Sequence, residues 1–397
     1  MMLRSSIIHQ KSESRNDWAG KGKLVRQRRL ASAHFTSGRS LLKREMALQT
    51  TRMPELNTTT HPNWSQNASV EKSCIDPDVW DALTSSQPVY LAIITVLGVV
   101  LNAFVLLVFC LQKKPCTVAE IYLSNLAAAD FILVSCLPFW AVNIANDFNW
   151  PFGVAMCKIV NAGIKMNAYS SIYFLVLVSM DRYLALVHPM SHGRMRRPKY
   201  AKVGCLLVWA FSLFLGAPTL VFRQVKYFAE YNVSACVLDF PSRTMMLLCD
   251  VMLISFSFVI PITIISFCTV KIIHALRKPS VDRFNNEKSE RKATTLVLVV
   301  LVAFLVCWIP FHIVTLLDVL IKAGVMEGCR LEAVVDICSQ FFDYLAFFNS
   351  IVNPILYVIV GKNFRKKAQE VCKQWSVSSF TSMSTRSQTS ATLRTFA

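Results

Sequence analysis

Four groups of polar or helix-bending residues lie inside long apolar stretches of the chain, where a charge or an amide is unfavourable. They are Asp130, the run Asp181-Arg182-Tyr183, Trp308 before Pro310, and Asn353-Pro354 before Tyr357. Ionisable groups within hydrocarbon usually face the interior of a helical bundle, where they serve ion paths, switches or ligands. These residues are therefore the first candidates for mechanism.

Asp130 follows three alanines, and small residues of this kind let helices approach one another closely. A carboxylate in this setting is neutralised either by a proton or by a cation. Oxygen atoms on other spans are available in Ser171, Asn349, Ser350 and Asn353. Since hard cations prefer oxygen ligands, we expect a sodium ion here; the alternative is a protonated, hydrogen-bonded Asp130.

Arg182 keeps its positive charge in any environment and therefore needs an anion. Asp181 is one candidate, and Glu290 at the inner end of the sixth apolar stretch is another. If both acids hold Arg182 at rest, breaking the contact with Glu290 would release the sixth helix. Arg182 would then belong to a two-state switch that a ligand can bias, although an isolated Asp-Arg-Tyr tripeptide is usually a surface pair.

Two prolines predict bends at positions that suit a switch. Pro310 follows Trp308 by two residues, and a proline inside a helix removes a backbone hydrogen bond. Packing partners for this junction are expected in Phe304, Ile172 and Pro261. In the seventh stretch, Asn353 and Pro354 repeat the arrangement, with an amide that can reach Asp130. Simple core packing around a kink is the alternative interpretation.

The composition predicts the helical scaffold that these residues need. The chain has 397 residues, of which 54% are hydrophobic and only 17% charged, so it is too apolar for an ordinary soluble fold. About 20 apolar residues cross the hydrocarbon as a helix. Candidate spans are 88–112, 118–145, 154–187, 199–221, 245–277, 288–322 and 331–359. We predict an all-α bundle of seven transmembrane helices over 88–360, followed by a short amphipathic helix over 361–373.

Lysine and arginine set the predicted orientation, because short loops rich in them stay cytoplasmic. They occur in the first, third and fifth connections, whereas the second connection, 146–153, has none. Residues 1–87 are thus expected to form a largely disordered extracellular segment, and 374–397 a Ser/Thr-rich cytoplasmic tail. Four glycosylation sequons fall on the predicted outer side. They are Asn57, Asn63, Asn67 and Asn232.

The net charge of +18 follows from this topology and from a basic amino-terminal segment, so we predict no nucleic-acid partner. Four cysteines are predicted at the outer side, where disulfides persist. We expect Cys157 to pair with Cys236 and Cys74 with Cys329. Cys372 follows a basic amphipathic stretch that would lie on membrane lipid, so it is a candidate for palmitoylation.

The order of these residues resembles the rhodopsin-like class of G-protein-coupled receptors from Gln87 to Cys372. Besides the motifs above, the similarity is carried by Asn102, Asp130, Cys157, Trp209 and Pro261. A closer resemblance is to the bradykinin (kinin) receptors, on the runs 119–123, 137–140, 149–153, 221–223, 317–318 and 357–362. Runs 180–186 and 392–395 resemble the type 2 receptor, whereas Lys165 and 187–190 resemble type 1.

The outer mouth suits a peptide with basic ends. Asp318 and Asp336 top the sixth and seventh spans, and carboxylates are the geometric partners of a guanidinium. The resemblance implies that these acids receive the amino-terminal Arg of a kinin peptide. Arg223 and Lys165 would receive the carboxylate at the other end. The floor of the site is expected to consist of Trp140, Phe311, Gln340 and Phe347.

The alternative interpretation is that Asp318, Asp336 and Arg223 are ordinary solvated charges, which is the commoner case for any one such residue taken alone. Lys165 differs because it lies within a span and needs a partner, for which Asp343 or Asp250 is available. These two acids are not part of the type 2 pattern, so the choice between full-length and carboxyl-shortened kinin stays open.

On the cytoplasmic side, Met190 is expected to contact a G protein, and the resemblance implies the Gq class, which raises calcium through phospholipase C. Phosphorylation of the tail by receptor kinases would add negative charge that arrestin can bind. We find no nucleophile–base pair in the sequence and no group of histidines at the spacing of a metal site, so we do not predict an enzyme. We also expect no resident cofactor beyond the sodium ion. A receptor for another vasoactive peptide or a chemokine, of the angiotensin type, is the alternative.

Overall fold

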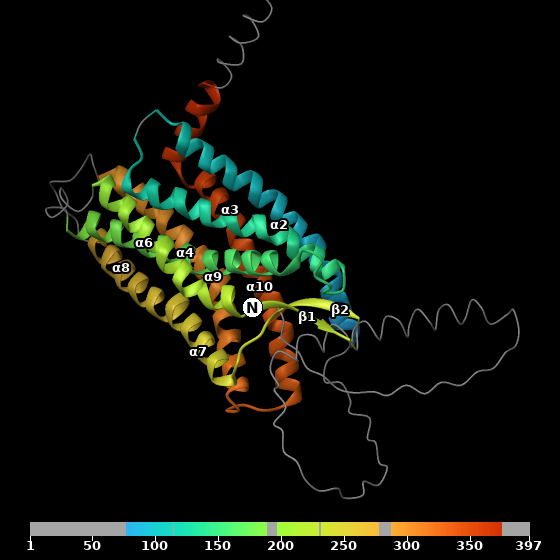
Figure 1. Ribbon diagram of the computed structural model, residues 1–397. Coiled ribbons are helices and arrows are strands. Elements are labelled where there is room, and N and C mark those ends of the chain that lie inside the picture. The colour runs from blue at the N-terminus through green and yellow to red at the C-terminus, as the bar shows by residue number, and fades with distance from the viewer. Residues whose placement is uncertain (1–76, 114, 189–196, 230–231, 278–286, 375–397) are drawn as a thin grey trace, which may run out of the picture.

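Seven long helices lie side by side in a single bundle in the computed structural model (Figure 1). The described residues are 77–113, 115–188, 197–229, 232–277 and 287–374, without the side chains of 77–84, 276 and 287–294. Each helix is long and apolar enough to cross a membrane. The predicted all-α architecture of seven spans is therefore confirmed.

The helices extend beyond the apolar windows that predicted them, because backbone hydrogen bonds continue into polar flanking residues. The first, second and third spans are α2 (Pro77–Leu111), α3 (Val118–Ala145) and α4 (Gly153–Val187). The fourth is α6 (Pro198–Phe222), and the fifth joins α7 (Arg243–Ile254), a π-helical turn η3 (Ser255–Val259) and α8 (Ile260–Arg277). The last two are α9 (Glu287–Lys322) and α10 (Cys329–Ile359), which run without a break through Pro310 and Pro354.

Local sequence signals fix several helix starts. Thr117 and Glu120 form a reciprocal capping box before α3, in which each side chain accepts a bond from the other residue's backbone N–H. Ser242 caps α7 by accepting from the N–H of Met245 at 3.2 Å. The turn between α9 and α10 uses Gly324 and Gly328 at φ values of 75° and 141°, where a side chain would be strained.

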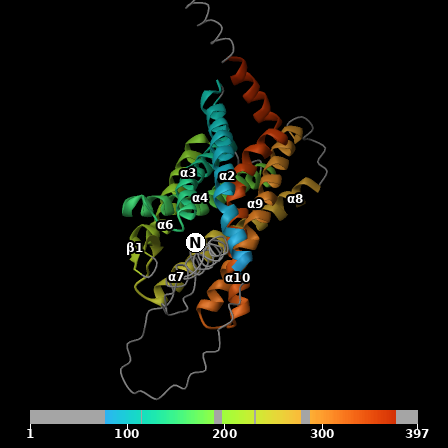
Figure 2. The ribbon, with the colours of Figure 1, turned by 90° about the vertical axis from the view of Figure 1, so that its right-hand side faces the viewer.

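A β-hairpin covers one end of the bundle, which is called the hairpin end below (Figures 1 and 2). Strands β1 (Arg223–Phe228) and β2 (Val233–Leu238) pair antiparallel. The hairpin is anchored to α4 by the Cys157–Cys236 disulfide, with its Cα atoms 5.7 Å apart. It is also anchored to the α3–α4 turn, since the N–H of Trp150 donates to the carbonyl of Ser234 at 2.8 Å. The sequence interpretation did not include this hairpin.

A further helix over 362–374 follows α10 at the opposite end of the bundle, called the Arg182 end (Figure 1). Phe364 is buried against Tyr357 and Phe109, and full burial of a Phe side chain contributes about 1.5–3 kcal/mol. Lys367 forms an ion pair with Glu120 of α3 at 2.6 Å. The short helix is thus tied to α2, α3 and α10, close to the bounds 361–373 expected from the sequence.

Candidate ligand cavity and switch residues

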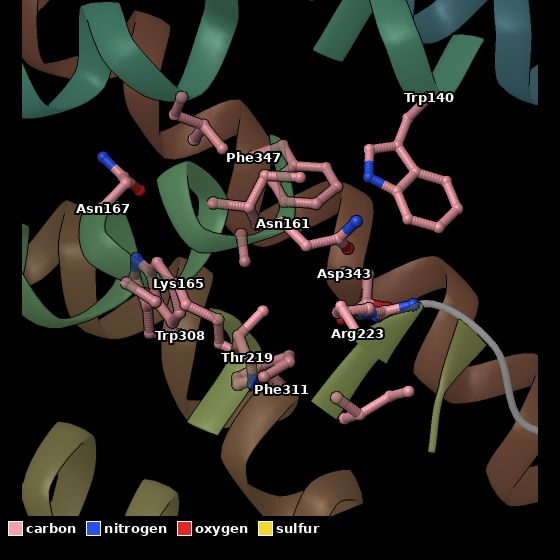
Figure 3. Close-up of a pocket in the computed structure, with 15 residues that line it drawn as sticks. Trp140, Asn161, Lys165, Asn167, Thr219, Arg223, Trp308, Phe311, Asp343 and Phe347 are labelled. Atoms are coloured by element: carbon pink, nitrogen blue, oxygen red, sulfur yellow. The ribbon is translucent and has the colours of Figure 1, made fainter. Parts of the chain in front are cut away.

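A cavity opens inside the bundle below the hairpin. It is lined by five of the eight predicted ligand residues, which are Arg223, Lys165, Trp140, Phe311 and Phe347. Figure 3 shows side chains from separate elements meeting here, with Trp140 from α3, Lys165 from α4 and Arg223 from the start of β1. Gln340, Asp318 and Asp336 are not among its lining residues, so their contacts with a ligand stay predictions.

Arg223 is placed by the junction where α6 ends and β1 begins. Its side chain is almost fully buried, and Nη1 donates to the carbonyl oxygen of Cys236 at 3.1 Å. The guanidinium carbon lies 6.0 Å from the centroid of the Trp140 ring, within cation–π range. Its Nε has no hydrogen-bond partner within the described ranges. Burial lowers the pKa of Arg223 to about 10, so the guanidinium is charged at neutral pH and available to an anion.

The two acids considered as partners of Lys165 have different environments. Asp250 contacts Lys322 of α9 at 2.8 Å instead. Asp343, from α10, lines the cavity with Lys165 and is 5% exposed, and its Oδ2 has no hydrogen-bond partner among the residues that the structure describes. Within the described ranges Lys165 makes no ion pair, although both acids act on it electrostatically.

The predicted guanidinium clamp lies outside the cavity. Asp318 is buried in α9, and its Oδ2 lies 3.0 Å from the ammonium of Lys322, four residues along the helix. Asp336 is half-buried in α10. A peptide that used the clamp would therefore compete with Lys322 for the carboxylate of Asp318.

Asp130 lies at the centre of a buried polar cluster. Its Oδ1 accepts from Nδ2 of Asn167 at 3.0 Å, and its Oδ2 accepts from Nδ2 of Asn353 at 2.9 Å. The side-chain oxygens of Ser171, Asn349 and Asn353 are buried, and no described residue donates to them. Ser171 and Asn349 share helix faces with the two amides that hold Asp130, because positions four apart lie on one face.

These acceptors suit a sodium ion, because a carboxylate and several oxygens without donors are the ligands that a hard cation needs. Ser350, the remaining predicted ligand, donates its hydroxyl to the carbonyl of Phe347 at 2.7 Å. Its oxygen can still coordinate.

Asn167 connects the cavity with Asp130, since it lines the cavity and its Nδ2 donates to the Asp130 carboxylate. The sequence interpretation missed this residue because an uncharged amide in a span gives a weaker signal than an acid. Its position one turn before Ser171 on the same face of α4 could have indicated it.

Trp308 also lines the cavity, and its ring belongs to a row of stacked aromatic rings. It stacks on Phe304, with centroids 5.5 Å apart and planes at 18°, and lies at 28° to the ring of His312. His312 stacks in turn on Phe258 of the π-helical turn η3, at 4.6 Å. Ile172 is in the same apolar cluster as Trp308 and Phe304, and Pro261 is also buried. His312 and η3 were not anticipated from the sequence.

The Arg182 end holds a buried ion pair. Nε and Nη2 of Arg182 contact Oδ2 of Asp181 at 3.0 and 2.5 Å, and both side chains are almost fully buried. The hydroxyl of Tyr183 instead lies 3.0 Å from Nε2 of His188 in an exposed contact. Met190 and the side chain of Glu290 lie outside the described set, so their roles stay predictions.

Several predicted modification sites are on or outside the described surface. Cys372 is exposed on the helix over 362–374. Asn232 is exposed in the hairpin turn, where its Oδ1 accepts from Tyr227 and leaves its Nδ2 for a glycan. Cys329 is disulfide-bonded. Outside the described residues are Cys74, Asn57, Asn63 and Asn67.

Known proteins share this pattern over most of the chain. A family model described as 7 transmembrane receptor (rhodopsin family) matches residues 101–357. The chain is 51% identical to the B2 bradykinin receptor of Sus scrofa over 301 residues, 75% of this chain and 82% of that protein. Identity to the B2 bradykinin receptor of Homo sapiens is 46%, over 80% of this chain and 81% of that one. Identity to the human B1 bradykinin receptor is 40%, over 75% and 85%.

Proposed function

Because the chain belongs to the bradykinin receptors within the rhodopsin family of seven-transmembrane receptors, we propose that it binds kinin peptides at the hairpin end and activates Gq-class G proteins at the Arg182 end. The protein is a multi-pass plasma-membrane protein. In the proposal the hairpin end is extracellular and the Arg182 end cytoplasmic. The observation that carries the ligand assignment is a cavity that combines aromatic walls with two cations, Arg223 and Lys165, which form no ion pair within the described residues.

The carboxylate of the peptide is the group that this cavity can best receive. The buried guanidinium of Arg223 has an Nε without a partner, and Lys165 lines the same space. Charge-assisted hydrogen bonds from such groups are stronger than neutral ones. The rings of Trp140, Phe311 and Phe347 would cover the adjoining side chains of the peptide. At the rim, Asp318 and Asp336 would take the amino-terminal Arg, with Lys322 displaced from Asp318.

The same cavity offers a physical route from the ligand to the switch residues. A peptide end that fills it would press on Trp308, which stacks on Phe304. It would also contact Asn167, which donates to Asp130. A sodium ion at Asp130, Ser171, Asn349, Ser350 and Asn353 would stabilise the resting arrangement. Ligand and ion would thus bias one two-state element in opposite directions.

At the other end, release of Arg182 from its acidic partners would open the surface for the G protein. Met190 would insert into the α subunit, and the signal would pass through phospholipase C to calcium. Phosphorylation of residues 374–397 by receptor kinases would supply charge for arrestin. The proposed topology also includes three kinds of covalent modification. They are glycans at Asn57, Asn63, Asn67 and Asn232, a Cys74–Cys329 disulfide, and palmitate on Cys372.

Calcium mobilisation in transfected cells tests the ligand and the coupling together. We expect full-length or carboxyl-shortened kinin to evoke a calcium response, and an angiotensin control to be inactive. Surface expression is measured in parallel with an amino-terminal epitope tag. Silence to every kinin at normal surface density would reject the ligand assignment.

The guanidinium clamp is tested by the double variant Asp318→Ala and Asp336→Ala. We expect weaker kinin potency, because the two carboxylates would no longer meet the amino-terminal Arg. A potency equal to that of the unmodified receptor would remove the clamp from the proposal.

A further inference from the structure

The hairpin half of the bundle contains charged side chains of both signs that are not exposed. Those within or next to the cavity include the bases Lys165, Arg223 and Lys322 and the acids Asp250, Asp318 and Asp343. Lys322 contacts two of the acids, Asp250 at 2.8 Å and Asp318 at 3.0 Å. Asp343 is the acid of this set that lines the cavity, together with Lys165 and Arg223.

Among these residues, Asp343 has a carboxylate oxygen that can still accept a hydrogen bond. It is 5% exposed, and no group in the described part of the chain donates to its Oδ2. A buried carboxylate oxygen without a donor is costly, because desolvation is not compensated by a hydrogen bond. Arg223 does not relieve it, since its guanidinium contacts the carbonyl of Cys236 and the ring of Trp140 instead. The cavity therefore presents an acceptor as well as two cations.

We propose that Asp343 binds the basic side chain of the peptide's carboxyl-terminal residue, while Lys165 and Arg223 hold that residue's carboxylate. This assignment rests on the proposed kinin-binding function and specifies its ligand end. A terminal arginine or lysine carries one positive and one negative group, so it can meet both the acid and the two cations that line the cavity. A peptide ending in an apolar residue would leave Asp343 without a donor.

A direct pair between Lys165 and Asp343 is the competing arrangement. The two side chains act on each other electrostatically, but they make no ion pair within the described part of the chain. If they paired in the bound state, Arg223 alone would hold the carboxylate. A basic last residue would then give no advantage, which makes the two arrangements distinguishable.

The test compares three kinin peptides on the full-length receptor in cells. One ends in arginine, one ends in citrulline, which has the same shape without the charge, and one lacks the last residue. Hydrogen bonds to charged groups are worth about 1.5–3 kcal/mol, so we expect the arginine peptide to be about 10- to 100-fold more potent than the citrulline peptide. In Asp343→Asn this ratio should fall to about one.

Asp250→Asn is the matched control, because it removes an equal charge from an acid that Lys322 already holds and that does not line the cavity. It should keep the full arginine-to-citrulline ratio. Equal potency of the two peptides on the unmodified receptor, or an undiminished ratio in Asp343→Asn, would overturn the proposal. If Asp343→Asn does not reach the surface, Asp343→Ser takes its place with the same expected ratio. Absence of any response to all three peptides would instead count against the kinin assignment itself.

Discussion

The two halves of the bundle hold their buried polar groups in different ways. Towards the Arg182 end, Asp130 accepts hydrogen bonds on both oxygens, and Arg182 contacts Asp181 through two nitrogens. Around the cavity, Arg223 and Asp343 each keep a buried polar atom without a partner among the described residues. The half around Asp130 and Arg182, called the compensated half below, thus holds its charged groups with partners inside the protein and leaves neutral oxygens of Ser171, Asn349 and Asn353 for an ion. The charged groups of the cavity are completed by a ligand.

This difference predicts two kinds of substitution effect. Where charges are paired inside the protein, removing one partner leaves the other buried and destabilises the fold. Where a buried charged side chain is paired only when the ligand binds, its removal relieves an existing desolvation cost. The stability of the ligand-free protein is then not reduced. The loss then falls on ligand affinity. Thermal stability without ligand and kinin potency are therefore the two measurements that separate the halves.

The largest effect is expected for Asp181→Ala. Breaking a buried ion pair by removing one partner costs about 3–5 kcal/mol, so the apparent melting temperature of the purified receptor should fall by several degrees. Basal calcium signalling should rise, because Arg182 loses a contact of the resting arrangement. Tyr183→Phe, which removes an exposed contact in the same motif, should change neither. An unaltered melting temperature in Asp181→Ala would contradict the claim that paired buried charges stabilise this half of the bundle.

Arg223→Gln should show the opposite pattern. Kinin potency is expected to fall by about 100-fold, equivalent to roughly 2.7 kcal/mol, because the peptide carboxylate loses its buried guanidinium. The ligand-free melting temperature should stay the same or increase. Lys226→Gln is the control on the same strand, since Lys226 forms an exposed pair with Asp239 at 2.6 Å and surface pairs contribute little. A variant that loses stability and keeps its potency would refute the role of Arg223.

Asp130→Asn tests whether the central cluster also holds sodium. If the ion prefers the resting arrangement, raising sodium should lower agonist affinity about fivefold in the unmodified receptor, a coupling near 1 kcal/mol. The variant should lose this dependence, because the amide carries no charge for the ion. Choline chloride at the same ionic strength controls for screening. A sodium effect that persists in the variant would place the ion elsewhere.

The sequence predicted the compensated half better than the cavity, for a physical reason. A charge within an apolar stretch is conspicuous, so Asp130 and Arg182 could be identified from hydropathy alone. Asn167 carries no charge and was missed. The π-helical turn is a backbone feature without a compositional signal, and it positions Phe258 against His312. Backbone register and neutral amides must be seen in three dimensions.

Charge partners across helices were also beyond the sequence. Asp250 was considered for Lys165, yet its partner is Lys322, which also contacts Asp318. Any lysine on a neighbouring span was an equal candidate, since spacing along one helix says nothing about which face meets which. The hairpin was missed for a related reason. Its strands pair through backbone register, which gives no strong local signal in a connection between helices.

The smallest predicted effect tests a single neutral bond in the compensated half. The indole Nε1 of Trp209 donates to Oδ1 of Asn125 at 3.0 Å, joining α6 to α3. Trp209→Phe should cost about 1 kcal/mol and leave kinin potency unchanged, because neither residue lines the cavity. The double variant with Asn125→Ala isolates the bond, since two changes that remove one shared interaction cost less together than the sum of their separate effects. Strict additivity of the two changes would mean that this bond does not stabilise the receptor, and compensation would then be confined to the charged groups.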